Sequence, residues 1–396
     1  MAPTPADQLN RSCRCITLDT KALDHLYKDI RAQRPNLFSA TATYLSVPDF
    51  LVMQDFIRVT DGLLASPAGP RGVFMGYDFH LTPEGPKLIE INTNAGGAYL
   101  NDILSRAQLA CCPVEDASHY GLVPTAERES FFLGMFRNEW RLAGRSSELR
   151  SIAIVDDDPK AQYLYPEFGL FRELFEKNQI SSVIADPREL TVREDGLYYE
   201  ALKIDLVYNR LTDFPLKELP HRHLHELWEK DLLVLTPSPL HHESHAHKLL
   251  LTRLSDDAYL RTKNLSDTER ALILKVVPKT RLVRATEAPE LWARRKTLFF
   301  KPVDGFGGRA AYRGDKLTTR VWGEIMKGEY VAQDLVPPGQ RTVAGKESAL
   351  KADLRAYVYD GKIILLAARL YEGQTTNFRT NGGGFSPVYL VSGKGP

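Results

Sequence analysis

The sequence predicts a mixed α/β protein. Between residues 151 and 235, short apolar runs alternate with amphipathic segments, which is typical of a mainly parallel sheet with helices on its faces. From residue 329 onward, apolar runs are joined by short turns such as Asp360-Gly361, which predicts antiparallel strands. A chain of 396 residues is long enough for about two or three domains. We place the domain boundaries near residues 150 and 240.

Composition and charge exclude several classes of partner. The chain has 43% hydrophobic and 26% charged residues and a formal net charge of +1, as in ordinary globular proteins. That charge gives no reason to expect a nucleic acid or an anionic membrane as a partner. The N-terminus lacks the basic-then-apolar pattern of a secretion signal, and no apolar run approaches 18 residues. We therefore expect a soluble, cytoplasmic protein.

Neither the cysteines nor the histidines show metal-site spacing. Four cysteines form two close pairs, Cys13 with Cys15 and Cys111 with Cys112. Neither pair is C-x-x-C and no histidine spacing completes a zinc site, so we expect reduced thiols. The histidine-rich run His241–His247 departs from H-E-x-x-H, and we expect it to cap a helix that begins near Ser244.

The first 150 residues combine helices with one hairpin. We expect helices over residues 20–34, 47–64, 98–110 and 127–142, the second with an approximate apolar stripe. Residues 71–80 and 88–92 read as two strands, and the turn between them contains two prolines and a glycine.

The rest of the chain contains the alternating strands and helices and, after them, the antiparallel strands. Expected strands cover residues 152–155, 181–185, 206–210, 232–235, 271–277, 298–301, 329–333, 352–359 and 362–370. Expected helices cover residues 163–177, 221–229 and 287–295, and Lys248 opens a further apolar-periodic segment. Arg210 follows a strand at the sheet edge where α/β proteins bind ligands.

A lysine and a glycine-rich loop form the first candidate site. Lys301 ends an apolar run, and three glycines follow within four positions, at Gly305, Gly307 and Gly308. Glycine allows positive φ and brings backbone N–H groups close to an anion. The stretch matches neither G-x-x-x-x-G-K-[ST] nor G-x-G-x-x-G. Alone, it fits a nucleotide phosphate loop and an ordinary glycine-rich hairpin about equally well.

The early hairpin holds the second candidate site. Glu90 and Asn92 are two residues apart, so they share one face of a strand, and Asp78 lies on the partner strand. Two carboxylates and an amide oxygen suit Mg²⁺. The alternative is a polar sheet face with incidental acids.

Together these segments resemble the ATP-grasp ligases, and most of all the glutathione synthetases. Residues 301–308, K-P-V-D-G-F-G-G, match six of eight positions of the K-P-L-D-G-M-G-G loop of the bacterial enzymes. Lys248 followed by Ser255-Asp256 resembles the earlier lysine of that family, and Asp353-Leu-Arg355 resembles its D-x-R. Residues 378–384, F-R-T-N-G-G-G, resemble its F-R-[ST]-N…G-G segment with a shortened spacer.

The metal motif stands in an unusual place. In the family, E-I-N normally lies near the C-terminus, whereas here Leu88-Ile-Glu-Ile-Asn-Thr93 lies near the N-terminus. Residues 70–112 therefore resemble a segment circularly permuted to the front, as in the eukaryotic enzymes. Residues 1–69 match nothing in the family.

The resemblance implies a permuted ATP-grasp fold with a preceding parallel-sheet domain. Residues 1–150 would hold a helical segment and the metal-binding hairpin, 151–240 the parallel-sheet domain, and 241–396 the ATP-grasp domain, completed by residues 70–112. The implied activity is an ATP- and Mg²⁺-dependent carboxylate–amine ligase that forms an amide through an acylphosphate and releases ADP. A small-molecule kinase of the same fold and a non-catalytic nucleotide-binding regulator remain as alternatives.

The resemblance also assigns residues and partners. The nucleotide would be held by Lys248, Lys301, Asp304, Gly305, Gly307, Gly308, Gln333, Asp334, Leu335 and Asp353. The Mg²⁺ ligands would be Asp78, Glu90 and Asn92, and the catalytic residues Arg355, Arg210, Asn381 and Arg379, with Arg355 on the γ-phosphate. The expected partners are a small-molecule acid and amine, such as an amino acid or short peptide, with no nucleic acid or membrane. A homodimer is left open.

Overall fold

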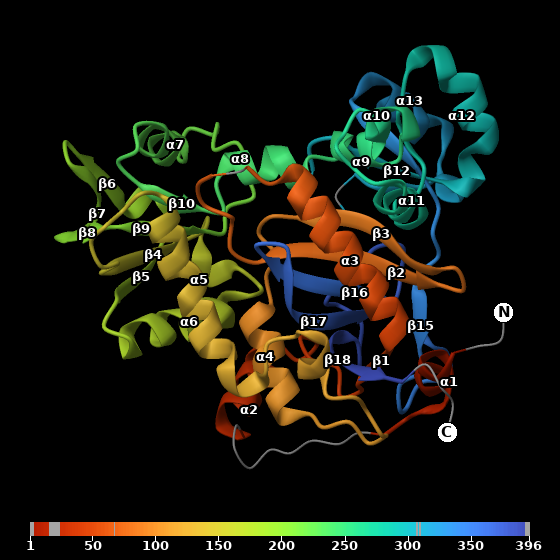
Figure 1. Cartoon of the computed structure of the whole chain (residues 1–396), viewed down its shortest axis with the longest axis horizontal. Helices are drawn as coiled ribbons and strands as arrows, with labels where there is room; N and C mark the ends of the chain where they lie inside the picture. Colours follow the sequence, from red (N-terminus) through yellow and green to blue (C-terminus); the bar gives the residue numbers. More distant parts are fainter. Residues whose placement is uncertain (1–3, 16–23, 67, 306–307, 309, 393–396) are drawn as a thin grey trace.

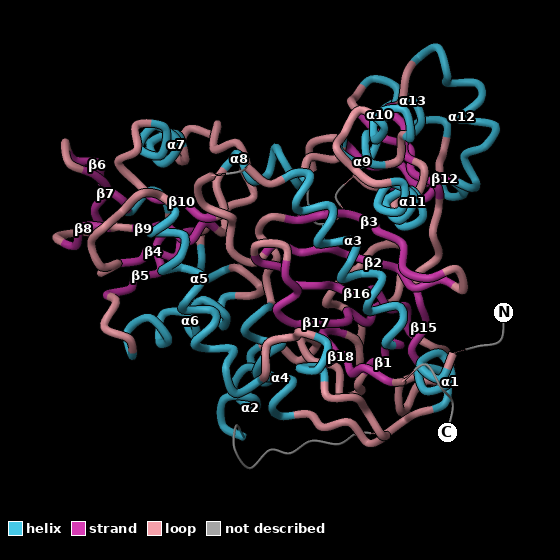
Figure 2. Tube along the Cα trace, in the orientation of Figure 1, coloured by secondary structure: helices cyan, strands magenta, loops and turns pink. Residues whose placement is uncertain are grey.

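The computed structural model describes residues 4–15, 24–66, 68–305, 308 and 310–392 (Figure 1). The chain forms a large mixed sheet, a parallel sheet, a small antiparallel lobe and a short three-stranded sheet. Figure 2 shows the strands of the large sheet in the middle of the molecule, with helices around them. This arrangement confirms the predicted mixed α/β class. No helix in the described ranges is long and apolar enough to cross a membrane.

The large sheet joins the two ends of the chain. Six of its strands follow the order β1-β18-β17-β16-β2-β3, and β15 pairs with β16. Its strands are β1 (Thr43–Ser46), β2 (Met75–Thr82), β3 (Gly85–Asn92), β15 (Gly339–Arg341), β16 (Leu350–Tyr359), β17 (Lys362–Tyr371) and β18 (Gly384–Val391). Because β2 pairs antiparallel with β16, the early hairpin belongs to the C-terminal sheet, as predicted.

Two helices cover the two faces of this sheet. Helix α3 (Val47–Leu64), whose bounds match the prediction, packs Phe56 onto Phe79 of β2 with ring centroids 6.0 Å apart. Helix α4 (Ala98–Ala107) packs on the opposite face with Tyr357. Along β16, the neighbours of Tyr357 pack on the α3 side, as the two-residue period of a strand requires.

The parallel sheet has the order β10-β9-β4-β5, with every pairing parallel. Its strands are β4 (Ser151–Val155), β5 (Ser181–Ala185), β9 (Leu206–Asn209) and β10 (Val234–Thr236), with helices α5 (Arg128–Leu142), α6 (Tyr165–Lys177) and α7 (Arg222–Glu229). These elements confirm the predicted alternation. The antiparallel strands β6 (Leu190–Arg193), β7 (Gly196–Tyr199) and β8 (Leu202–Ile204) were not predicted.

The lobe at the upper right of Figure 1 contains the strand that ends in Lys301 and Pro302. Its sheet has the order β11-β14-β12-β13, from β11 (Thr280–Leu282), β12 (Leu298–Pro302), β13 (Tyr312–Arg313) and β14 (Tyr330–Asp334). Its helices are α9 (Leu249–Leu254), α10 (Asp257–Arg261), α11 (Asp267–Val276), α12 (Ala288–Arg294) and α13 (Thr319–Lys327).

Some local predictions were wrong. The predicted strand over residues 271–277 lies mostly in α11, because Ser266 and Glu269 form a capping box and the buried Ile273 and Val276 are three residues apart. The helix expected near Ser244 starts earlier, as α8 (Pro239–His241) continued by a π-helical turn over His242–Ala246. Helix α1 (Pro5–Ser12), β1 and β18 were not predicted, and α2 covers Asp24–Gln33.

The packing of α3 on the hairpin can be tested at Phe79, which is fully buried. Phe79→Ala should lower the free energy of unfolding by about 3–5 kcal/mol, because the lost ring leaves a cavity. Urea denaturation measures this value. Leu51→Ala, on the exposed side of α3, is the control and should change it little. A loss below about 1 kcal/mol for Phe79→Ala would contradict this packing.

Candidate functional site

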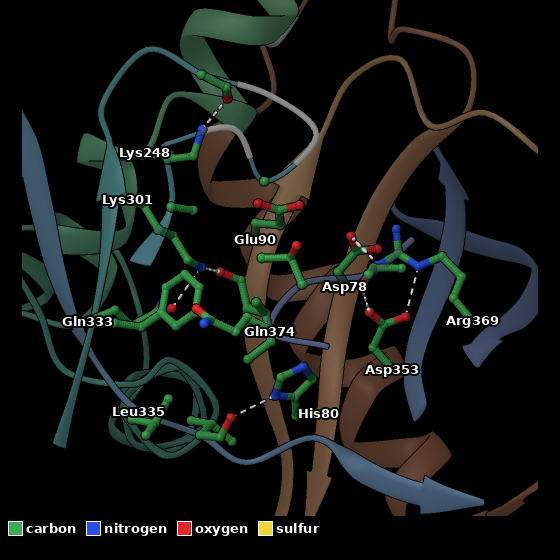
Figure 3. Close-up of a pocket in the computed structure, with 18 of the residues that line it drawn as sticks. Asp78, His80, Glu90, Lys248, Lys301, Gln333, Leu335, Asp353, Arg369 and Gln374 are labelled. Atoms are coloured by element: carbon green, nitrogen blue, oxygen red, sulfur yellow. Dashed lines mark hydrogen bonds and ion pairs between the residues drawn. The ribbon is translucent and has the colours of Figure 1, made fainter. Parts of the chain in front are cut away.

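A cavity of about 350 Å³ lies between the large sheet and the small lobe (Figure 3). The lobe contributes Lys301 and Gln333, and Lys248 just before α9 lies beside them. The large sheet contributes Asp78, Glu90, Asp353 and Arg369. The cavity therefore has a cationic wall facing an acidic one.

The two predicted lysines converge on this cavity. Lys301 is buried, and its Nζ donates to the Ile89 carbonyl oxygen at 2.7 Å and to Gln333 Oε1 at 2.9 Å. Burial lowers the pKa of Lys301 to about 8, although the charge of Glu90 opposes this shift. Burial also lowers the pKa of Lys248, whose Nζ donates to the Gly305 carbonyl oxygen. Both ammonium groups are poorly solvated, so an anion in the cavity would stabilise them.

Only part of the glycine loop can be placed. Gly305 and Gly308 line the cavity, and Gly308 has a φ of 70°. Gly307 lies outside the described residues. Asp304 is largely exposed and does not line the cavity; its Oδ1 lies 3.5 Å from His247 Nε2. The remaining predicted nucleotide residues, Asp334 and Leu335, line the cavity beside Gln333.

The three predicted metal ligands share one face of the hairpin. Asp78 lies directly opposite Glu90 in the β2–β3 register. The Asn92 side-chain amide donates to Asp78 Oδ2 at 3.1 Å and to Glu90 Oε1 at 3.2 Å. Asp78 and Glu90 line the cavity, whereas Asn92 does not line it and is hydrogen-bonded to these two carboxylates.

The carboxylate of Asp78 forms ion pairs with two arginines. Its Oδ1 accepts from Arg355 Nε at 2.6 Å, and its Oδ2 accepts from Arg355 Nη2 at 2.6 Å and from Arg369 Nη2 at 2.8 Å. Burial would raise the pKa of Asp78, but the two guanidinium groups outweigh it and hold that pKa below its usual range. Asp78 is therefore an ion-pair partner here, whereas Glu90, the other carboxylate of the hairpin site, forms no ion pair within the described part of the chain.

Arg355 does not line the cavity, because it points along the sheet to Asp78. The sequence did not single out Arg369, which does line it and donates from Nε to Asp353 Oδ1 at 2.8 Å. Asp353 also accepts from Thr376 Oγ1. The four charged groups form a row across β2, β16 and β17, in which all but Arg369 are buried, and which we call the Asp–Arg row: Asp78, Arg355, Arg369 and Asp353.

The remaining predicted catalytic residues lie outside the cavity lining. Arg210, buried after β9, donates to the Tyr208 hydroxyl at 3.2 Å and lies against Gly96 of the loop after β3. Arg379 and Asn381 are exposed in the loop between β17 and β18. In that loop it is Gln374, Thr375, Thr376 and Phe378 that line the cavity.

His80 is a further lining residue that the sequence did not single out. Its Nδ1 lies 2.8 Å from the Val336 carbonyl oxygen, so it links β2 to the segment after β14 (Figure 3). Burial lowers the pKa of His80, which favours the neutral ring at neutral pH. Its place two residues after Asp78 on the same strand face could have indicated it.

No protein-family model and no curated protein sequence matches the chain. Among solved structures, it is similar to a glutathione synthetase-like effector from Globodera pallida, with a TM-score of 0.53 and 14% identity over 95% of this chain and 98% of that one. It is also similar to a protein described as a gamma-glutamylcysteine synthetase from Methylobacillus flagellatus, with a TM-score of 0.51 and 9% identity over 93% and 88% of the two chains.

At these identities the likeness shows the fold alone. The predicted glutathione synthetase-like fold is confirmed. The circular permutation and the roles of individual residues stay predictions.

The Asp–Arg row predicts a pH-dependent stability. Asp78→Asn should lower the free energy of unfolding by about 3–5 kcal/mol at neutral pH, because it leaves the buried Arg355 without a counter-charge while Arg369 keeps only Asp353. The folded-state pKa of Asp78 is depressed, so its contribution is present above the unfolded pKa of about 3.9 and is lost as pH falls through the folded pKa. Denaturant unfolding of both proteins from pH 7 to pH 2 should show their difference shrinking at acidic pH.

Asp195→Asn serves as the control, because Asp195 forms an ion pair with Lys203 at the surface. It should leave the unfolding free energy nearly unchanged at every pH. A difference between wild type and Asp78→Asn that does not depend on pH would contradict the assigned charge state of Asp78.

Proposed function

We propose that the cavity binds ATP with Mg²⁺ and that the protein is an ATP-dependent carboxylate–amine ligase. One observation carries the proposal: the buried Lys301 and the partly buried Lys248 face the carboxylate of Glu90 across one cavity. Phosphates need cations and Mg²⁺ needs oxygen ligands, and an ATP site needs both on facing walls.

Two features of the lobe fit the nucleotide. Lys301 and Lys248 supply positive charge beside Gly305 and Gly308, where we place the phosphates. Phe299, Leu335 and Val336 supply apolar surface for the base. The Nε2 group of Gln333 is a buried donor without a hydrogen-bond partner among the described residues, which suits a ligand acceptor.

The hairpin wall fits the metal, with one change from the predicted roles. Glu90 offers a carboxylate and Asn92 an amide Oδ1, both hard oxygen donors that suit Mg²⁺. The Asp78 carboxylate accepts hydrogen bonds from Arg355 and Arg369. We therefore propose that Asp78 positions these two arginines, and that Glu90 and Asn92 are the main metal ligands. Bound Mg²⁺ would offset phosphate charge and bridge the nucleotide to the hairpin.

The proposed reaction joins an acid and an amine. The acid carboxylate attacks the γ-phosphate to give an acylphosphate and ADP, and the amine then displaces phosphate to give the amide. The protein would contribute positioning and charge stabilisation. Arg369, held between Asp78 and Asp353, is the arginine on the cavity wall that we assign to the developing charge. Arg210, Arg379 and Asn381 remain candidates for contacting the acid or the amine.

We also propose the circular permutation and the division at residues 150 and 240. The pairing of β2 with β16 supports the permutation, because it brings the early E-I-N motif beside the D-x-R strand. The acid would be an amino acid or short peptide, and the protein would act in the cytoplasm.

One assay distinguishes a ligase from a kinase and from a non-catalytic nucleotide-binding protein. The protein is incubated with ATP, Mg²⁺ and pooled amino acids, and ADP, free phosphate and products are measured. A ligase yields ADP, free phosphate and a product with the mass of acid plus amine minus water. ADP with a phosphorylated product and no free phosphate would indicate a kinase. Unchanged ATP under every substrate pool would contradict catalysis.

Lys301→Ala should weaken nucleotide binding and remove turnover. A charge-assisted hydrogen bond is worth about 1.5–3 kcal/mol, which corresponds to about a 10- to 150-fold rise in Kd. Isothermal titration with a non-hydrolysable ATP analogue measures this change. Lys327→Ala, at the exposed end of α13, is the matched control. Equal affinity in Lys301→Ala and wild type would remove Lys301 from the site.

Glu90→Gln should keep the fold and lose Mg²⁺-dependent turnover, since it removes one negative charge at nearly constant shape. Activity is measured as ADP formation against Mg²⁺ concentration, and circular dichroism checks the fold. Glu84→Gln, at the exposed turn of the same hairpin, is the matched control. A wild-type Mg²⁺ profile in Glu90→Gln would contradict the metal assignment.

A further inference from the structure

The four cysteines of the chain come together although their two pairs are about 100 residues apart in sequence. Cys13 follows α1, and Cys111 and Cys112 lie in the loop after α4. The Sγ–Sγ distances are 3.3 Å for Cys13–Cys111, 3.7 Å for Cys111–Cys112 and 3.9 Å for Cys112–Cys13. The sulfur of Cys15 lies within 4.8 Å of those of Cys13 and Cys111, whereas the sulfur of Cys112 lies outside that group of three and is close only to those of Cys13 and Cys111.

These spacings match a tetrahedral thiolate site. A Zn²⁺ ion binds thiolate sulfur at about 2.3 Å, which places neighbouring sulfurs of a tetrahedron about 3.8 Å apart. The three measured distances lie around that value. A disulfide would join only two sulfurs, at about 2.05 Å. Three sulfurs at these mutual distances, with Cys15 next to two of them, therefore fit one shared ion better than one covalent pair.

A buried arginine beside the cluster lacks an anion. Arg341 on β15 is fully buried, and its Nη1 donates to the Cys13 carbonyl oxygen at 2.6 Å. Its Nε and Nη1 donate to backbone carbonyl oxygens, its Nη2 has no hydrogen-bond partner, and no carboxylate forms an ion pair with it within the described ranges. A buried unpaired charge is costly. Four thiolates around one Zn²⁺ would carry a net charge of −2 and would offset the charge of Arg341.

The cluster also lies where two segments distant in sequence meet, the end of α1 and the loop after α4. Helix α1 has eight residues, too few for a stable isolated helix. The apolar cluster that holds it has only four buried members among the described residues, Ala6, Cys13, Tyr44 and Val391. A metal bound by residues on both sides would tie the N-terminal segment to the loop after α4.

We propose that Cys13, Cys15, Cys111 and Cys112 form a structural thiolate site for Zn²⁺. Each thiol releases its proton to solvent as it binds the metal. Cys15 and Cys111 are exposed, so the ion can reach the site from solvent. The individual pairs lack zinc spacing, and only the fold unites them. The site is independent of the ATP cavity, so its test does not depend on the proposed activity.

The test uses the full-length, reduced, metal-free protein. Zn²⁺ is titrated against a chromophoric chelator, and Co²⁺ is added as a spectroscopic probe. We expect one Zn²⁺ per chain, a thiolate-to-cobalt charge-transfer band, the intense visible bands of tetrahedral Co²⁺, and a higher Tm with Zn²⁺.

Cys15→Ser and Cys111→Ser change exposed positions, so the fold should survive. Each should weaken Zn²⁺ binding more than about 100-fold, because loss of even an outer partner of a ligand costs 10- to 100-fold. His119→Ala, at an exposed histidine seven residues after Cys112, is the control and should keep one Zn²⁺ per chain.

Two results would overturn the proposal. One is an absence of Co²⁺ thiolate bands in the reduced wild type. The other is unchanged Zn²⁺ stoichiometry and affinity in the Cys15→Ser, Cys111→Ser double variant, which would place the ion elsewhere. A Cys13–Cys111 disulfide formed in air by a protein whose reduced form binds no Zn²⁺ would replace the metal site with a redox pair.

Discussion

The Asp–Arg row is the interaction on which the rest of the site depends. Asp78 on β2 pairs with Arg355 on β16 and Arg369 on β17, and Arg369 also pairs with Asp353. Two carboxylates and two guanidinium groups balance each other inside the sheet. Removing Asp78 would leave Arg355 without an ion-pair partner, and removing Arg369 would leave Asp353 without one, so the row ties the early hairpin to the C-terminal strands. Glu90 and Asn92 are positioned by that attachment, since Asn92 bonds to both Asp78 and Glu90.

Sequence reasoning found the lysines and the acidic residues of the cavity because its motifs are local. Each motif can be recognised within a few residues: the lysine before the glycines, the E-I-N strand and the D-x-R strand. The family resemblance then indicated that the three motifs belong to one site. Two β-bulges, which the sequence does not reveal, set which residues of neighbouring strands lie opposite each other, and one of them explains why Arg369 was missed. Regular pairing from the turn at Asp360-Gly361 would set Asp353 opposite Ala368, whereas a bulge at Tyr357/Val358 sets it opposite Arg369. A bulge at Asp78/Phe79 likewise sets Asp78 opposite Glu90 rather than Ile89.

Other misses also came from contacts that sequence spacing does not reveal. The apolar run at residues 271–277 reads as a strand until the cap at Ser266 and Glu269 is recognised as the start of a helix. The cysteines are a second example. Neither close pair has the sequence spacing of a zinc site, but the fold brings the sulfur of Cys13 to 3.3 Å from that of Cys111. Strands β1 and β18 pair in parallel across more than 300 residues, and no local pattern indicates such a partner.

The central claim is that one cavity binds phosphates on the lobe and a metal on the hairpin. The most direct measurement is a crystal structure of the protein with a non-hydrolysable ATP analogue and Mg²⁺. We predict the phosphates beside Lys301 and Lys248 and a metal ion on Glu90, with Asp78 still paired to Arg355. A nucleotide bound away from Lys301, or a metal bound to neither Glu90 nor Asn92, would contradict the account.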